Sequence, residues 1–215
     1  MPDTIQLPVE DYRLLVAIRY SNAAGAICEG LRRQCGVNDF HFLVTLRSFI
    51  EYTRRGIWFL VWATDAELRA AGELTFDRAG SPSLVHMDKM INHALGLGQV
   101  SHLLEPSAGI SEPFLNCLHA LTHGNPISVR FLGFGLDRIF QTDKLLVRAE
   151  MEANLFTILI CRRALGEDFN SIWTTLARIN NRPADMMANA KIATFQFKNS
   201  RLAERFGEIK TPTVP

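Results

Sequence analysis

Polar side chains gather on one side of a predicted helix that ends at Gly-Asn-Pro. The segment SEPFLNCLHALTHGNP, residues 111–126, carries Asn116, His119 and His123. At about 100° per residue, these three positions fall within one sector of a helix, beside an apolar stripe. Imidazoles at positions i and i+4 can chelate a metal, exchange protons near neutral pH or hydrogen-bond to a neighbouring helix. Their spacing alone does not show which of these roles they have. We take Asn116, His119 and His123 as the candidate catalytic residues.

Two other interpretations of this segment compete with catalysis. In the first, the histidines are buried and satisfied by hydrogen bonds within the core. In the second, His119 and His123 form a metal site with Glu51 or Glu152 inside a four-helix bundle. The ligand patterns H-E-x-x-H and E-x-x-H are absent from the segment. We therefore expect no bound metal and no cofactor.

A second group of charges interrupts the most apolar predicted helix. Arg47, Glu51 and Arg54 share one face of it, and Glu51 can pair with Arg47 or Arg55. One interpretation is a solvated stripe of i,i+4 ion pairs. The other places the stripe across a cleft from the histidines, where a guanidinium would bind phosphate and the carboxylate would orient an imidazole. We therefore predict Arg47, Glu51 and Arg54 as phosphate- or partner-binding residues.

A third group of charges lies on the helix that Thr142 and Asp143 are predicted to open. Arg148 and Glu152 stand at positions i and i+4 in this helix. Such a pair is typical of an exposed helix surface. We expect both residues on a solvated face.

Helices along nearly the whole chain are needed to position these residues, and the apolar pattern predicts them. Apolar residues recur at threes and fours, and glycine follows several of the segments. Asn38 or Asp39 can cap one helix, and Ser111 is a candidate cap of another. The expected helices cover about 9–34, 39–72, 83–95, 111–123, 142–165 and 168–179, with a last one after Pro183. We predict an all-α, up-and-down bundle of about six to seven helices. It forms one domain over 1–215, with a core at about 8–165, a helical extension at about 166–207 and a disordered tail at 208–215.

Composition and charge narrow the function classes. Lys and Arg total 23 against 22 for Asp and Glu, so the formal charge of +1 gives no global attraction to nucleic acid or to an anionic membrane. The four cysteines form no C-x-x-C pair, which favours a reducing compartment. The first residues, MPDTIQLPVED, lack a basic segment followed by an apolar run, and no apolar stretch approaches the roughly 20 residues of a membrane span. We expect a cytoplasmic protein that does not bind membranes.

The order of these elements resembles the helical HEPN-like proteins related to abortive-infection and toxin components. The likeness covers roughly residues 10–165 and rests on the long first helix, the LRSFIEYTRRGIWFL helix and the helix closed by LHALTHGNP. Active members of that superfamily carry Arg, four to six further residues and then His at a helix end. They act as metal-independent ribonucleases across a dimer interface. His123 matches that histidine, whereas Asn116, six intervening residues earlier, stands where the family has Arg.

The resemblance implies an RNA-binding protein or a ribonuclease with an altered motif, working as a homodimer. His123 would be the general acid or base, His119 its complement, Asn116 a positioning donor, and Arg47 or Arg54 a phosphate contact. The alternative is a non-enzymatic helical interaction module, antitoxin-like or linked to immunity. In that case it would bind a protein partner, and the same residues would be hydrogen-bonded between helices.

Overall fold

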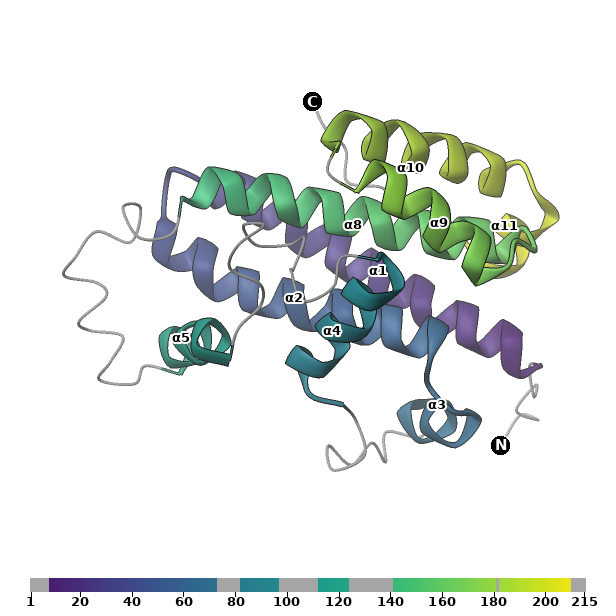
Figure 1. Ribbon diagram of the computed structural model, residues 1–215, viewed down its shortest axis with the longest axis horizontal. Helices are drawn as coiled ribbons and strands as arrows, with labels where there is room; N and C mark the ends of the chain where they lie inside the picture. Colours follow the sequence, from purple (N-terminus) through teal and green to yellow (C-terminus); the bar gives the residue numbers. More distant parts are fainter. Residues whose placement is uncertain (1–7, 73–81, 97–111, 124–140, 181, 210–215) are drawn as a thin grey trace.

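The computed structural model describes residues 8–72, 82–96, 112–123, 141–180 and 182–209. Within these residues the chain forms nine α-helices and no β-strand, which confirms the all-α prediction. The helices pack side by side as a bundle (Figure 1). None of the described helices is both long enough and apolar enough to cross a bilayer.

Three long helices form the centre of the bundle: α1 (Val9–Gln34), α2 (Asp39–Val61) and α8 (Thr142–Ala164). A tight connection turns the chain between α1 and α2, where Gly36 adopts a φ of 70° that glycine tolerates best. Asn38 then caps α2 by accepting a hydrogen bond from the His41 backbone N–H at 3.0 Å. The two helices therefore run antiparallel, and α8 packs against both (Figure 1).

A glycine allows these three helices to approach one another closely. A Cβ atom added at Gly56 of α2 would lie 2.7 Å from Cβ of Tyr20 on α1 and closer still to the ring of Phe156 on α8. Real Cβ atoms essentially never come within 3.0 Å of such neighbours. A side chain larger than that of glycine therefore does not fit at Gly56 unless these helices move apart.

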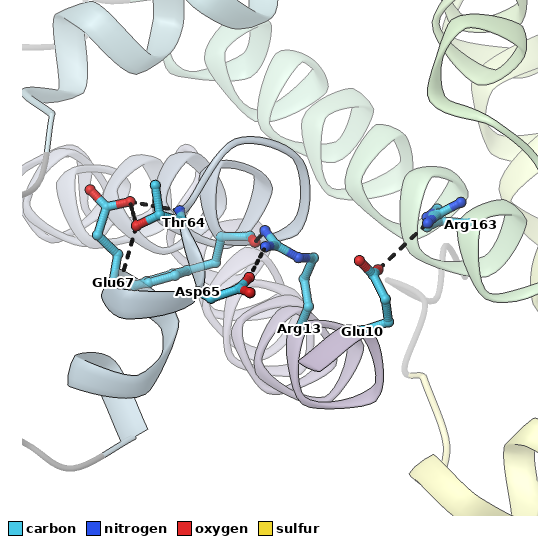
Figure 2. Close-up of polar contacts among 7 residues, drawn as sticks. Glu10, Arg13, Thr64, Asp65, Glu67 and Arg163 are labelled. Carbon is cyan, nitrogen blue, oxygen red and sulfur yellow. Dashed lines mark hydrogen bonds and ion pairs between the residues drawn. The ribbon is translucent and has the colours of Figure 1, made fainter. Parts of the chain in front are cut away.

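The helix expected over 39–72 is in fact two helices, α2 and α3 (Asp65–Gly72). Arg13 of α1 donates a hydrogen bond to the backbone oxygen of Phe59 at 2.8 Å, which satisfies a carbonyl in the last turn of α2. Thr64 and Glu67 then form a reciprocal capping box, since each side chain accepts a backbone N–H of the other residue, at 3.3 and 2.7 Å (Figure 2). The prediction of one continuous helix was wrong because it overlooked this cap.

Two shorter helices, α4 (Leu84–Ala94) and α5 (Glu112–Thr122), both pack on α2. Helix α4 begins close to the predicted position, and Ser83 caps it by accepting a hydrogen bond from the His86 backbone N–H at 3.2 Å. Ser111, the predicted cap of α5, lies outside the described residues. In Figure 1, α5 lies beside the N-terminal half of α2, and α4 lies nearer the middle of the bundle.

The C-terminal helices pack on the central ones: α9 (Phe169–Ile179), α10 (Pro183–Lys198) and α11 (Arg201–Phe206). Helix α10 lies along α8, and Phe197 of α10 shares a buried cluster with Leu159 of α8 and Ile18 of α1. The predicted disordered tail was placed too early. Ile209 is only 1% exposed, and the Glu208 carbonyl accepts a hydrogen bond from Asn22 of α1 at 3.1 Å. The rest of that tail, 210–215, lies outside the described residues.

Candidate functional site

The candidate catalytic residues lie on the exposed side of α5. Leu118 and Leu121 turn inward, at 0% and 2% exposure, and fix the helix to the core beneath it. Asn116, His119 and His123 are all exposed. The two leucines and the three polar residues lie on different sides of α5 because successive residues are turned by about 100° around the helix, as the sequence pattern predicted.

The two imidazoles lie side by side. Their ring centroids are 4.2 Å apart and the ring planes are inclined by 53°. The backbone supports this arrangement, because the His123 N–H donates to the His119 carbonyl at 3.0 Å and so extends the last turn of α5. The interpretation in which both histidines are buried and hydrogen-bonded in the core was wrong, since both are exposed. They are open to a ligand.

Arg47 and Glu51 lie on α2, the helix on which α5 packs. Both side chains are half-buried, and Glu51 accepts a hydrogen bond from Nε of Arg55 at 3.1 Å, the i,i+4 pairing that the sequence allowed. Among the described residues no hydrogen bond or ion pair joins Arg47 or Glu51 to the histidines. The structure brings the two groups onto neighbouring helices but not into direct contact.

Arg54 is in a different environment from Arg47 and Glu51. Its side chain is 0% exposed and lies between two carboxylates, Asp88 of α4 and Glu152 of α8. Nη2 donates to Oδ1 of Asp88 at 2.7 Å, and Nη1 donates to Oε2 of Glu152. The second oxygen of Asp88 accepts from the Asn92 amide at 3.1 Å. We call Arg54, Asp88 and Glu152 the buried triad.

The buried triad is held together by charge. Burial alone would lower the pKa of Arg54, but the adjacent Glu152 and Asp88 carboxylates outweigh it, so the pKa is raised and the guanidinium stays charged. A guanidinium enclosed in this way cannot reach a phosphate in solvent, so the phosphate-contact role predicted for Arg54 does not fit its position. The solvated face expected for Glu152 was likewise wrong, because that side chain is 0% exposed.

The residues of the alternative metal site are not brought together. Among the described residues, no group of three or more His, Cys, Asp and Glu side chains could hold a metal ion. His119 and His123 are exposed, whereas Glu152 is in the core and paired with Arg54. The four-helix metal interpretation therefore has no support in the described part of the chain.

Sequence reasoning missed Asp88 and Asn92. Both lie on the buried face of α4, at 3% and 1% exposure, beside Met87 and Ile91. A carboxylate and an amide within an apolar stripe were a signal, because such residues stay buried only with a partner. The partner could not be read from the sequence, since Arg54 is 34 residues away from Asp88.

Comparisons with protein-family models, with curated proteins and with solved structures found no match to this chain.

Proposed function

We propose that this chain is an HEPN-like RNA-binding protein that cleaves RNA through the exposed His119–His123 pair without a metal ion. The observation that carries the proposal is the 4.2 Å separation of the two imidazole centroids on an exposed helix face. Imidazole changes charge near neutral pH, so two adjacent rings can supply a proton acceptor and a proton donor. Asn116, exposed on the same helix, can donate a hydrogen bond to a phosphate oxygen.

RNA carries its own nucleophile beside every phosphodiester bond, the 2′-hydroxyl. In the proposed reaction one imidazole takes the 2′-hydroxyl proton as that oxygen bonds to phosphorus. The other imidazole donates a proton to the departing 5′-oxygen. The products are a 2′,3′-cyclic phosphate and a 5′-hydroxyl end, so every atom and proton is accounted for. His123 acts as general acid or base, His119 is its complement, and Asn116 positions the phosphate.

The proposal also needs positive charge near the phosphate, because negative charge develops on its oxygens in the transition state. Helix α5 contains neither Arg nor Lys. Arg47 on the adjacent α2 is one source of charge. A homodimer that joins two copies of α5 is the other, since it would gather four imidazoles around one phosphate. We therefore propose the homodimer as the active form.

The test is cleavage of a labelled single-stranded RNA, in the presence of chelator, by the wild type and four variants. We expect His119→Ala, His123→Ala and Asn116→Ala to lose activity and keep the wild-type thermal unfolding, because all three residues are exposed. His86→Ala is the matched control, since His86 is an exposed histidine on a different helix, α4. It is expected to cleave like the wild type.

Two outcomes would contradict the proposal. Cleavage that survives both histidine substitutions would come from another site or a contaminant. Cleavage of a substrate whose only reactive position is 2′-deoxy would exclude the internal nucleophile. Light scattering on the same samples measures the oligomeric state, and full activity in a monomer would remove the dimer from the proposal.

A non-enzymatic interaction module is the second candidate, and two exposed apolar residues on α10 favour it. Ile192 is 56% exposed and Phe195 is 70% exposed, and their i,i+3 spacing places them on one face of α10. Adjacent exposed apolar residues form a surface that a protein partner can cover. The variant Phe195→Asp tests this surface: a dimer that dissociates in this variant assembles through α10, whereas a dimer that persists assembles through another face.

A further inference from the structure

A pocket of about 760 Å³ opens at the opposite end of α2 from the histidine pair. It lies where the C-terminal ends of α2 and α4 meet one face of α9. Figure 1 shows α9 at the far side of the bundle from α5. The side chains that give the pocket its chemistry are Trp62, His93, Phe169, Asn170, Trp173 and Arg178. Nothing in the sequence pattern singled out this group, because its members come from three separate segments: the residue that follows α2, helix α4 and helix α9.

Two indole rings form one wall of the pocket. Trp62 and Trp173 are nearly parallel, with an interplanar angle of 17° and ring centroids 6.1 Å apart. Trp173 is held in place, at only 7% exposure, whereas Trp62 is half-buried and keeps part of its surface free. Rigid, flat aromatic faces that reach solvent favour stacking of a planar ring such as a nucleobase.

The charged side chains around the pocket favour a negatively charged ligand. Arg178 and His93 line it and both are exposed, and no Asp or Glu of the described residues lines it. Nε of Arg178 donates weakly to the Thr174 carbonyl at 3.4 Å, which orients the side chain along α9. Arg178 has no ion-pair partner among the described residues, so its terminal nitrogens are available to an anion. A guanidinium binds phosphate with two parallel hydrogen bonds.

We propose that this pocket binds a nucleoside monophosphate, with the base stacked on the Trp62 indole and the phosphate bound by Arg178 with His93 beside it. The volume lies within the range of about 300–1,000 Å³ that is usual for small-molecule sites. Asn170 lines the pocket and is exposed, so its amide can hydrogen-bond to groups on the base edge. The proposal does not depend on the histidine pair of α5. The nucleotide is either a free mononucleotide or one unit of a single-stranded RNA, and the two sources share this chemistry.

The test is isothermal titration calorimetry of the full chain with AMP, adenosine, ribose 5-phosphate and a five-residue oligoadenylate. AMP is expected to bind at one site per chain. Adenosine, which lacks the phosphate, and ribose 5-phosphate, which lacks the base, are each expected to bind at least tenfold more weakly. Arg178→Gln is expected to weaken AMP binding at least tenfold, and His93→Gln is expected to weaken it less. Both residues are exposed, so both variants keep the fold.

A matched control and a spectroscopic readout complete the test. Arg33→Gln removes a highly exposed arginine from the last turn of α1, where its only ion-pair partner in the described chain is Glu29 of the same helix, and it is expected to bind AMP like the wild type. Tryptophan fluorescence should fall on AMP binding, and Trp62→Leu should abolish most of that fall.

Each result decides the question. Binding of AMP that Arg178→Gln weakens and Arg33→Gln does not supports a free-nucleotide site. Binding of the oligoadenylate alone, with the same dependence on Arg178, supports the site and identifies its ligand as a unit of RNA. The proposal is overturned if neither ligand binds up to millimolar concentration, or if Arg178→Gln binds as tightly as Arg33→Gln.

Discussion

Replacing Gly56 by alanine should destabilise the protein, whereas the same change at Gly30 should stabilise it. Both glycines lie inside long helices, Gly56 in α2 and Gly30 in α1. A Cβ atom at Gly30 would meet nothing within 4 Å, whereas one at Gly56 would overlap Tyr20 and Phe156. The two variants therefore share their chemistry and differ only in packing.

The expected magnitudes follow from two opposing effects. Alanine is better than glycine inside a helix by about 1 kcal/mol, and this gain applies at both positions. Overpacking costs about 1–3 kcal/mol, and more where neighbours cannot move. At Gly56 the obstacles are a ring that is 0% exposed and the Cβ of Tyr20, which is fixed to the α1 backbone. We expect Gly56→Ala to lose about 2 kcal/mol and Gly30→Ala to gain up to about 1 kcal/mol.

Urea unfolding followed by circular dichroism at equal protein concentration measures both changes. The two free energies of unfolding should differ by about 3 kcal/mol, far beyond the error of such curves when they are compared at their midpoints. Equal stability of Gly56→Ala and Gly30→Ala would refute the reasoning, because it would mean that α1, α2 and α8 can move apart at no cost. A destabilised Gly30→Ala would refute the assumption that its surroundings are open.

Three further predictions are tested by the same unfolding assay, with amide exchange added for the second. Arg54→Met leaves two buried carboxylates without their guanidinium and should lower the free energy of unfolding by about 3–5 kcal/mol. Arg47→Met should lower it by less than about 1 kcal/mol. Equal losses in the two variants would contradict the importance of the buried triad. Thr64→Ala should lower the free energy of unfolding by about 1 kcal/mol and accelerate amide exchange in α3. Thr64→Ser keeps the hydroxyl and should do neither. Unchanged amide exchange in the alanine variant would contradict the capping box. Burial raises the pKa of Cys28 and Cys161 from 9.0 to about 12, so their thiols ionise first in the unfolded chain. Below about pH 9 these thiols should not change the free energy of unfolding, and above it each should lower that free energy by about 1.4 kcal/mol per pH unit. Cys161→Ala should therefore lose less stability between pH 9 and pH 10.5 than the wild type. Equal losses would contradict this assignment.

The sequence predicted those features that depend on neighbouring residues. Asn38, Ser83 and Asp168 stand at the predicted starts of α2, α4 and α9, and each caps its helix by accepting from a backbone N–H three residues later. The exposed side of α5 followed from the spacing of Leu118 and Leu121 in the same way. These features need only the geometry of a single helix.

Features that join distant parts of the chain could not be predicted in this way. Arg54 looked like one more member of a charged stripe, and only the packing of α4 and α8 against α2 shows that it is buried, with Glu152 98 residues away. The same holds for the pocket, in which Trp62 and Trp173 meet although 111 positions separate them. The break between α2 and α3 is a different case, since the Thr64 capping box was visible in the sequence and was overlooked.

The buried triad also restricts how the helices can slide along one another. Leucine and isoleucine contacts tolerate a shift of one helix by a turn, about 5.4 Å, because one apolar side chain replaces another. The contacts of Arg54 do not, since such a shift would leave a guanidinium facing hydrocarbon and a carboxylate without its partner. Together with the close approach at Gly56, Arg54 therefore fixes the axial register of α2, α4 and α8. A variant core that replaces all three charged residues by apolar ones should fold with less uniform helix positions even where it unfolds at a higher temperature.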